Sequence, residues 1–256
     1  MKFSPRVAFV VVALAFCLLP RAHADDPNTR DSKTQAASIN TQLALAYMRD
    51  NKLAAAKEKI DKALQQHAGT ADTQMAAGFI YDRLGDKAKA SKHYEQAARL
   101  AKDNPDVLQN VGVHLCRTGE YKRGEQLLVQ TAQSALYRTP AVAYTNAGRC
   151  AREGSRPQDA ERYFRQALSI NPKQPDALLQ MAELTQTAGS DLQARAFLER
   201  YTAVAPVTSA TLWLGRSIEL GLGDAAEAAK YSQRLKKEFP DSVETGKLYD
   251  AEHAKP

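Results

Sequence analysis

The sequence predicts an all-α protein built as a solenoid of stacked helix-turn-helix repeats. Three observations predict it: small and large residues alternate at helical spacing, the pattern recurs every 34 residues, and the composition is 44% apolar and 25% charged with few candidate strands. The pattern is clearest in residues 71–104, where it comprises Gly78, Tyr81, Gly85, Ala90, Tyr94 and Ala97. Gly78 lets a second helix approach, and Gly85 turns the chain between the two helices.

The pattern recurs in phase on either side of residues 71–104. Upstream it comprises Ala44, Tyr47, Asn51, Ala56, Ile60 and Ala63, and downstream Gly112, Leu115, Gly119, Gly124, Leu128 and Thr131. A 34-residue period of this kind is typical of the tetratricopeptide repeat (TPR), so we expect about six repeats in a right-handed superhelix. The predicted repeats are 37–70, 71–104, 105–138, 141–174, 175–208 and 209–242, with Thr139 and Pro140 as an insertion. The sixth repeat has Arg216 where a small residue is expected.

The N-terminal 24 residues resemble a secretory signal peptide. A basic start precedes an apolar stretch over residues 7–19, and Ala22-His23-Ala24 forms a small-x-small cleavage site. Acylation at Cys17 is the alternative, although Phe16 stands where a lipoprotein signal has a small residue. Either way, we expect an exported protein.

The remaining end segments are expected to be short. Residues 25–36 are predicted to be a polar lead-in, and residues 243–256 a C-terminal cap and tail. Removing the leader takes away three basic residues and no acid, so the formal net charge falls from +6 to +3. With no basic block and no aromatic-interleaved stripe, the sequence does not favour nucleic-acid binding.

The sequence contains no recognisable catalytic or metal-binding motif. No two of the five histidines are spaced i, i+4, and the nucleotide-binding, hydrolase and metalloprotease signatures are absent. We therefore expect no enzyme activity, no cofactor, no metal and no small-molecule substrate.

Cys116 and Cys150 are the two cysteines of the mature chain, and they fall on the first helices of adjacent repeats. These helices stack side by side, and export permits oxidation. A disulfide is the favoured interpretation, and two buried thiols the alternative.

The first helices of repeats one to three carry apolar residues that the helix-pair core does not use. A partner-binding groove is predicted from these residues: Leu45, Met48, Met75, Phe79 and Val113. An exposed apolar strip on a rigid inner face suits a docking segment, and methionine adapts to varied partners. The alternatives are that these residues pack neighbouring repeats, or that an N-terminal helix over residues 30–38 covers them.

Arginines form a possible basic ladder at the ends of the first helices: Arg49, Arg83, Arg117 and Arg152. They could receive an acidic partner. The favoured explanation is that cations suit the C-terminal end of a helix dipole.

Four stretches resemble the PilF/PilW family of type IV pilus biogenesis and stability proteins: residues 40–47 (NTQLALAY), 114–119 (HLCRTG), 136–150 (LYRTPAVAYTNAGRC) and 198–214 (LERYTAVAPVTSATLWL). The resemblance covers about residues 36–245 and includes the insertion after the third repeat. It implies an exported, periplasmic six-repeat protein associated with the outer membrane. Its implied role is that of a pilotin, which helps the outer-membrane secretin of the pilus to localise or multimerise.

Family members are commonly lipoproteins, and this chain departs from them at Phe16. The departure implies only indirect membrane contact unless Cys17 is lipidated. Another envelope TPR scaffold, in secretion or cell-wall assembly, is the alternative function.

Overall fold

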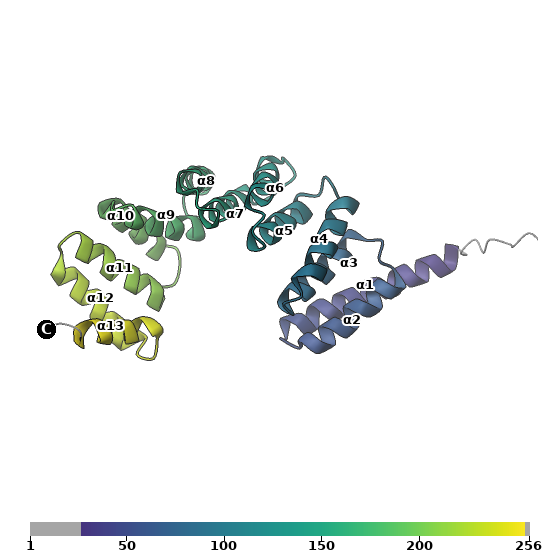
Figure 1. Cartoon of the computed structure of the whole chain (residues 1–256), viewed down its shortest axis with the longest axis horizontal. Helices are drawn as coiled ribbons and strands as arrows, with labels where there is room; N and C mark the ends of the chain where they lie inside the picture. Colours follow the sequence, from purple (N-terminus) through teal and green to yellow (C-terminus); the bar gives the residue numbers. More distant parts are fainter. Residues whose placement is uncertain (1–26, 254–256) are drawn as a thin grey trace, which may run out of the picture.

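The computed structural model describes residues 27–253, which form thirteen α-helices and no strand. Six antiparallel helix pairs and one final helix stack side by side into a curved solenoid (Figure 1). The helices are α1 (Pro27–Arg49), α2 (Leu53–Gln66), α3 (Ala71–Arg83), α4 (Lys87–Leu100), α5 (Pro105–Arg117), α6 (Tyr121–Gln133), α7 (Pro140–Glu153), α8 (Pro157–Ile170), α9 (Pro175–Thr187), α10 (Asp191–Thr202), α11 (Ser209–Gly221), α12 (Ala225–Glu238) and α13 (Val243–His253). The predicted signal peptide lies outside the described residues.

The helices follow the predicted 34-residue frame. Helices α3, α5, α9 and α11 begin at residues 71, 105, 175 and 209, the first residues of four predicted repeats. The connection between α6 and α7 spans residues 134–139 and is two residues longer than the connections before α3, α5 and α9. It contains Thr139, while Pro140 begins α7. The insertion therefore lies at the end of this loop and the start of α7, and α9 and α11 still begin at the first residues of their repeats.

The first helix is longer than the sequence pattern predicted. We expected a polar lead-in over residues 25–36, but α1 already begins at Pro27. No glycine or proline interrupts residues 28–49. Once the repeat has fixed the helix, adding each further turn costs little free energy. The polar composition therefore did not reveal this helical extension, in which residues 31–36 are exposed or half-buried.

Each helix pair is held at a crossing between a small and a large side chain. A Cβ atom at Gly148 would lie 2.4 Å from the Phe164 ring, so only glycine fits there. In the sixth repeat the expected small residue is displaced by one position: Gly215 approaches Tyr231, while Arg216 donates a hydrogen bond of 3.2 Å to Ser232. The sixth repeat keeps its close approach, at Gly215 in place of Arg216, because the small and the large residue are both displaced by one position.

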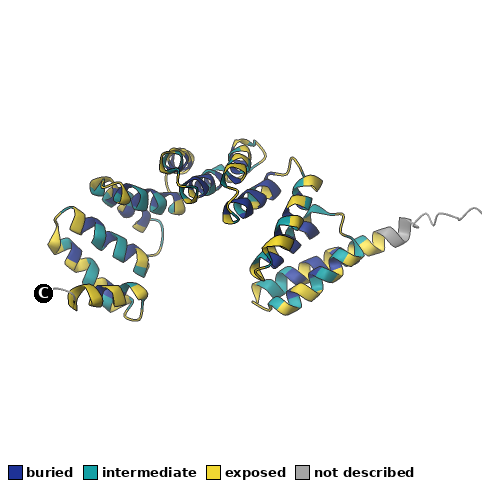
Figure 2. Ribbon diagram, in the orientation of Figure 1, coloured by how far each residue is buried: buried dark blue, intermediate teal, exposed yellow. Residues whose placement is uncertain are grey.

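Buried residues lie between the helix pairs, and exposed residues cover both outer sides (Figure 2). The two larger apolar clusters meet within α5: Leu115 belongs to the N-terminal cluster and Cys116 to the C-terminal one. A third cluster brings Leu212 and Leu235 against Leu248 of α13. Helix α13 therefore closes the C-terminal end of the stack.

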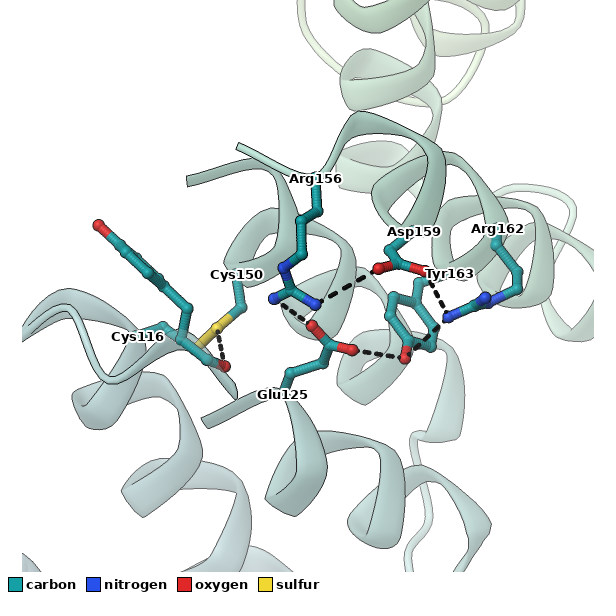
Figure 3. A network of polar contacts seen from close by, with 8 residues as sticks. Cys116, Glu125, Cys150, Arg156, Asp159, Arg162 and Tyr163 are labelled. Carbon is teal, nitrogen blue, oxygen red and sulfur yellow. Dashed lines mark hydrogen bonds and ion pairs between the residues drawn. A yellow bond between two sulfur atoms is a disulfide. The ribbon is translucent and has the colours of Figure 1, made fainter. Parts of the chain in front are cut away.

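The junction between the two larger clusters carries a disulfide and a polar network. Cys116 of α5 and Cys150 of α7 are joined by a disulfide with an S–S distance of 1.97 Å. Beside it, Glu125 of α6 lies between Arg156 and Tyr163, and the Tyr163 hydroxyl donates a hydrogen bond of 2.8 Å to it (Figure 3). Burial and this hydrogen bond raise the pKa of Tyr163. The junction is therefore fixed by covalent and polar contacts in addition to apolar packing.

The turn inside each repeat requires one residue with a positive φ. That residue is the fifteenth of every repeat: Asn51 (57°), Gly85 (79°), Gly119 (90°), Ser155 (59°), Gly189 (74°) and Gly223 (77°). Asparagine tolerates the left-handed region and glycine adopts it freely, whereas serine is strained there. Ser155 is thus the least suited residue at this position.

Ser155→Gly should raise the free energy of unfolding by about 0.5–1 kcal/mol, because the strain removed exceeds the extra chain entropy of glycine. Thermal and urea melts of the purified chain measure the change. Gln166→Gly, at an exposed position inside α8, is the control, and it should lower the stability because glycine disfavours a helix interior. Equal effects of the two substitutions would contradict this account of the turn.

Reduction of the disulfide should lower the free energy of unfolding by about 3–4 kcal/mol, as the chain-entropy model gives for a loop of this length, with residual structure able to reduce the value. The sequence separation of the two cysteines is 34 residues. Urea melts with and without reductant measure the difference. A Cys116→Ala/Cys150→Ala variant is the control, since reductant should not change its melt. An unchanged midpoint for the reduced wild-type chain would contradict the prediction.

Candidate protein-docking groove

A groove with a volume of about 680 Å³ lies between α1 and α3. Helix α5 contributes one lining residue, Asn110. The lining combines apolar and polar side chains: Thr34, Ser38, Thr41, Gln42, Leu45, Met48, Thr70, Asp72, Thr73, Met75, Ala76, Phe79 and Asn110.

Helical spacing places the apolar lining on one side of each helix. Leu45 and Met48 are three residues apart on α1, and Met75 and Phe79 are four apart on α3, so each pair shares a face. Figure 1 shows α5 and α7 on the inner side of the arch, with α6 and α8 outside. Because α1 and α3 are the first helices of their repeats, Leu45 and Phe79 occupy equivalent positions in the two repeats.

The four apolar side chains differ in exposure. Phe79 is 37% exposed, whereas Leu45, Met48 and Met75 are half-buried and also pack against the N-terminal core cluster. Both interpretations from the sequence, an exposed apolar strip and packing between neighbouring repeats, therefore describe part of the geometry. Phe79 is the most accessible apolar residue of the groove, and the others form its floor.

Val113 is not part of this groove, contrary to the sequence-based expectation. It packs against the C-terminal core cluster, and α5 instead contributes Asn110. The spacing rule placed Val113 correctly on a first helix. It did not predict that the core changes from one cluster to the next within α5. Val113 packs against the C-terminal cluster and therefore does not line the groove.

The N-terminal part of α1 forms a wall of the groove and does not cover it. Thr34 and Ser38 line that wall. The sequence pattern did not predict Thr34 as a lining residue because residues 25–36 were expected to be a polar lead-in, although no glycine or proline follows Pro27 before the end of α1.

The threonines of the groove bond to one another and to the backbone. Thr41 donates to the Ala37 carbonyl at 2.8 Å and lies 3.1 Å from the Thr73 hydroxyl, to which Thr70 donates at 2.8 Å. These bonds tie α1 to α3 and stiffen the groove. Its floor therefore offers apolar contact more than free hydrogen-bonding groups.

The predicted basic ladder lies at the C-terminal ends of the first helices. Arg49, Arg83 and Arg117 are the last residues of α1, α3 and α5. Arg117 pairs with Asp82 at 3.1 Å, and Arg152 of α7 pairs with Glu183 of α9 at 2.5 Å. Two of the four arginines thus link neighbouring repeats, and Arg49 and Arg83 are exposed.

His114 is buried at the junction of the second and third repeats. It is 2% exposed, its Nε2 lies 2.8 Å from the Ser91 hydroxyl, and its ring stands 4.4 Å from that of Tyr94. Burial lowers its pKa, which favours the neutral ring at neutral pH. His114 is therefore a packing residue between the two repeats.

The part of the chain that the structure describes contains no cluster of three or more potential metal ligands. Across the same residues, no helix combines the length and the apolar character needed to cross a bilayer.

Comparison with known proteins identifies the repeats and the relatives of the chain. Models of the tetratricopeptide repeat match residues 71–104, 151–213 and 209–242. The type IV pilus assembly protein PilF of Pseudomonas aeruginosa is 27% identical over 240 residues, which cover 93% of this chain and 95% of PilF. An uncharacterised protein of Haemophilus influenzae is 30% identical over 116 residues, which cover 45% of this chain and 65% of that protein.

Solved structures give the same grouping. The crystal structure of PilW, a widely conserved type IV pilus biogenesis factor, matches with a TM-score of 0.77 at 28% identity, covering 84% of this chain and 99% of the PilW chain. The structure of Pseudomonas aeruginosa PilF matches with a TM-score of 0.72 at 25% identity, covering 86% of this chain and 99% of that chain. The chain is therefore a tetratricopeptide-repeat protein that is homologous, over most of its length, to PilF and PilW.

Proposed function

We propose that this protein is a periplasmic adaptor of type IV pilus biogenesis that acts as a pilotin. In this role it binds the outer-membrane secretin of the pilus and promotes its localisation or multimerisation. The contact is made by the groove between α1 and α3, on the concave side of the solenoid. The protein performs no chemical step and requires no cofactor.

Homology supports the pilus assignment. The match to PilF extends over nearly the full length of both chains, as expected for proteins of the same architecture and general role. Likeness to PilW, a type IV pilus biogenesis factor, covers almost the whole PilW chain. TPR folds bind other proteins through the faces of their stacked helices, so a partner-binding role agrees with the fold.

The groove is the observation that carries the docking proposal. Soluble proteins rarely leave a contiguous apolar hollow open to water unless it binds something. This one has a volume of about 680 Å³, and two methionines and Phe79 line it. Methionine side chains repack at low cost around partners of varied shape. A secretin segment with apolar anchors would fill this hollow.

Localisation follows from the proposed export. Residues 1–24 act as a signal peptide in this proposal, and cleavage after Ala24 releases the chain into the periplasm. Association with the outer membrane then depends on the bound secretin. Lipidation at Cys17 would add a direct anchor, and intact-mass analysis of the exported protein distinguishes the two cases.

The alternative is an envelope scaffold that acts in secretion or cell-wall assembly. Deletion of the gene, followed by twitching assays and a blot for secretin multimers, separates the two functions. Loss of both motility and multimers supports the pilotin role. Normal multimers in the deletion strain would favour the alternative.

Phe79→Glu should weaken capture of the secretin by about 2 kcal/mol or more, roughly a 30-fold loss of affinity, because a charge replaces an apolar anchor in the groove. The melting temperature should stay nearly unchanged, since this side chain is 37% exposed. Pull-down of the secretin by purified variants, together with thermal melts, measures both quantities. Leu45→Glu should also weaken capture, but with some loss of stability because Leu45 packs against the core.

Leu84→Glu is the matched control for this prediction. Leu84 has the same exposed fraction, 37%, but lies at the end of α3 outside the groove. Arg83→Ala should have a small effect that depends on salt, since its side chain is exposed at a helix end. Equal secretin capture by wild-type and folded Phe79→Glu protein would exclude the groove as the docking site.

A further inference from the structure

The N-terminal end of the stack exposes a helix face that every later repeat buries. The face consists of the third and seventh residues of each first helix, counted in the repeat frame. In the first repeat these are Ile39, which is 52% exposed, and Leu43, which is 42% exposed. In the later repeats the same positions are all buried: Thr73 and Ala77, Val107 and Val111, Ala143 and Ala147, Ala177 and Met181, and Thr211 and Gly215.

The preceding helix pair covers this face in the later repeats. Thr73 of α3 lies 3.1 Å from Thr41 of α1, and one turn beyond the seventh position Tyr81 of α3 donates a hydrogen bond to Asp61 of α2. In the third repeat, His114 of α5 contacts Ser91 of α4 in the same way. The molecule therefore shows repeatedly what occupies this face: helices packed alongside, with the second helix of the preceding repeat among them.

One helix is enough to close an end of this stack. At the C-terminal end, α13 packs against α11 and α12, and Leu248 is 1% exposed within a cluster with Leu212 and Leu235. Among the described residues, no helix plays this part at the N-terminal end, where α1 contacts α2 and α3. The two ends therefore differ in burial: Leu248 is buried at the C-terminal end, whereas Ile39 and Leu43 are exposed at the N-terminal end.

We propose that Ile39 and Leu43 form a second docking face, which receives an amphipathic helix of a partner protein packed like the second helix of a preceding repeat. The occupant is a helix because a helix satisfies its own backbone hydrogen bonds while its apolar stripe covers the aliphatic side chains. It completes the stack at the N-terminal end as α13 does at the other. This proposal stands independently of the secretin groove.

The face and the groove are separate surfaces of α1. Leu43 and Leu45 are two residues apart, which corresponds to roughly 200° of rotation about the helix axis. The groove lining accordingly includes Leu45 but neither Ile39 nor Leu43. A substitution on one surface can thus be tested without changing the other.

The third repeat indicates which helix makes the best probe. Its residues at the two positions, Val107 and Val111, are branched aliphatics like Ile39 and Leu43, and each is 4% exposed. Helix α4 precedes them and shares their core cluster through Tyr94 and Ala97. A partner helix for the N-terminal face should therefore present a stripe of small and aromatic residues at i, i+3 or i+4 spacing.

The test uses the full chain and a fluorescent peptide of residues 87–102, stapled on its solvent face to keep it helical. Fluorescence anisotropy measures the affinity. Leu43→Lys should lower the affinity at least 10-fold without changing the thermal melt, since Leu43 is 42% exposed. Leu100→Lys is the matched control: Leu100 is also 42% exposed, lies at the end of α4, and its substitution should leave the affinity unchanged.

Three results would overturn the proposal. The first is no saturable binding of the peptide to the folded wild-type chain. The second is binding that Phe79→Glu abolishes and Leu43→Lys does not, which would assign the peptide to the groove. The third is a dimer in sedimentation that Leu43→Lys dissociates, which would assign the face to a second copy of this chain. Loss of peptide binding in Leu43→Lys with normal secretin capture supports the face as a separate site.

Discussion

The close crossing of two helices within each repeat is the contact on which the rest of this structure depends. A small residue on the first helix lets a large side chain of the second helix lie against its backbone, as Gly148 does for Phe164. This approach buries one stripe of each helix but leaves the flanks of both helices apolar. The flanks are buried only when another pair stacks beside them, so an isolated repeat has no complete core. A continuous solenoid follows from this local constraint.

Stacking also explains why the groove exists. The first helices of neighbouring repeats lie side by side, and the side chains between them are shared by core and surface. Leu45, Met48 and Met75 contact the core with one part and line the groove with another. The groove is stiff because the threonines beneath it bond α1 to α3. A rigid apolar hollow reduces the conformational entropy lost on binding.

The middle of the molecule is reinforced where the apolar core is divided. Leu115 and Cys116 are consecutive but belong to different clusters, and the disulfide from Cys116 to Cys150 spans this division. Glu125 adds polar contacts to the next helix pair through Arg156 and Tyr163. The junction thus fixes the orientation of the two halves where apolar packing is discontinuous.

The sequence by itself determined the repeat frame, because the crossing of each helix pair requires a small residue at a fixed spacing from a large one. That requirement predicted all six repeats, the insertion near Thr139, and the first helices that carry the cysteines and the groove residues. The tertiary structure decided which flanking residues remain exposed, since neighbouring repeats set exposure and spacing does not. Val113 therefore joined a core cluster, Phe79 stayed open to solvent, and Ile39 was left uncovered at the end of the stack. The repeat pattern also did not predict that α1 begins at Pro27. A helix anchored in the stack extends through polar residues that carry no periodic signal.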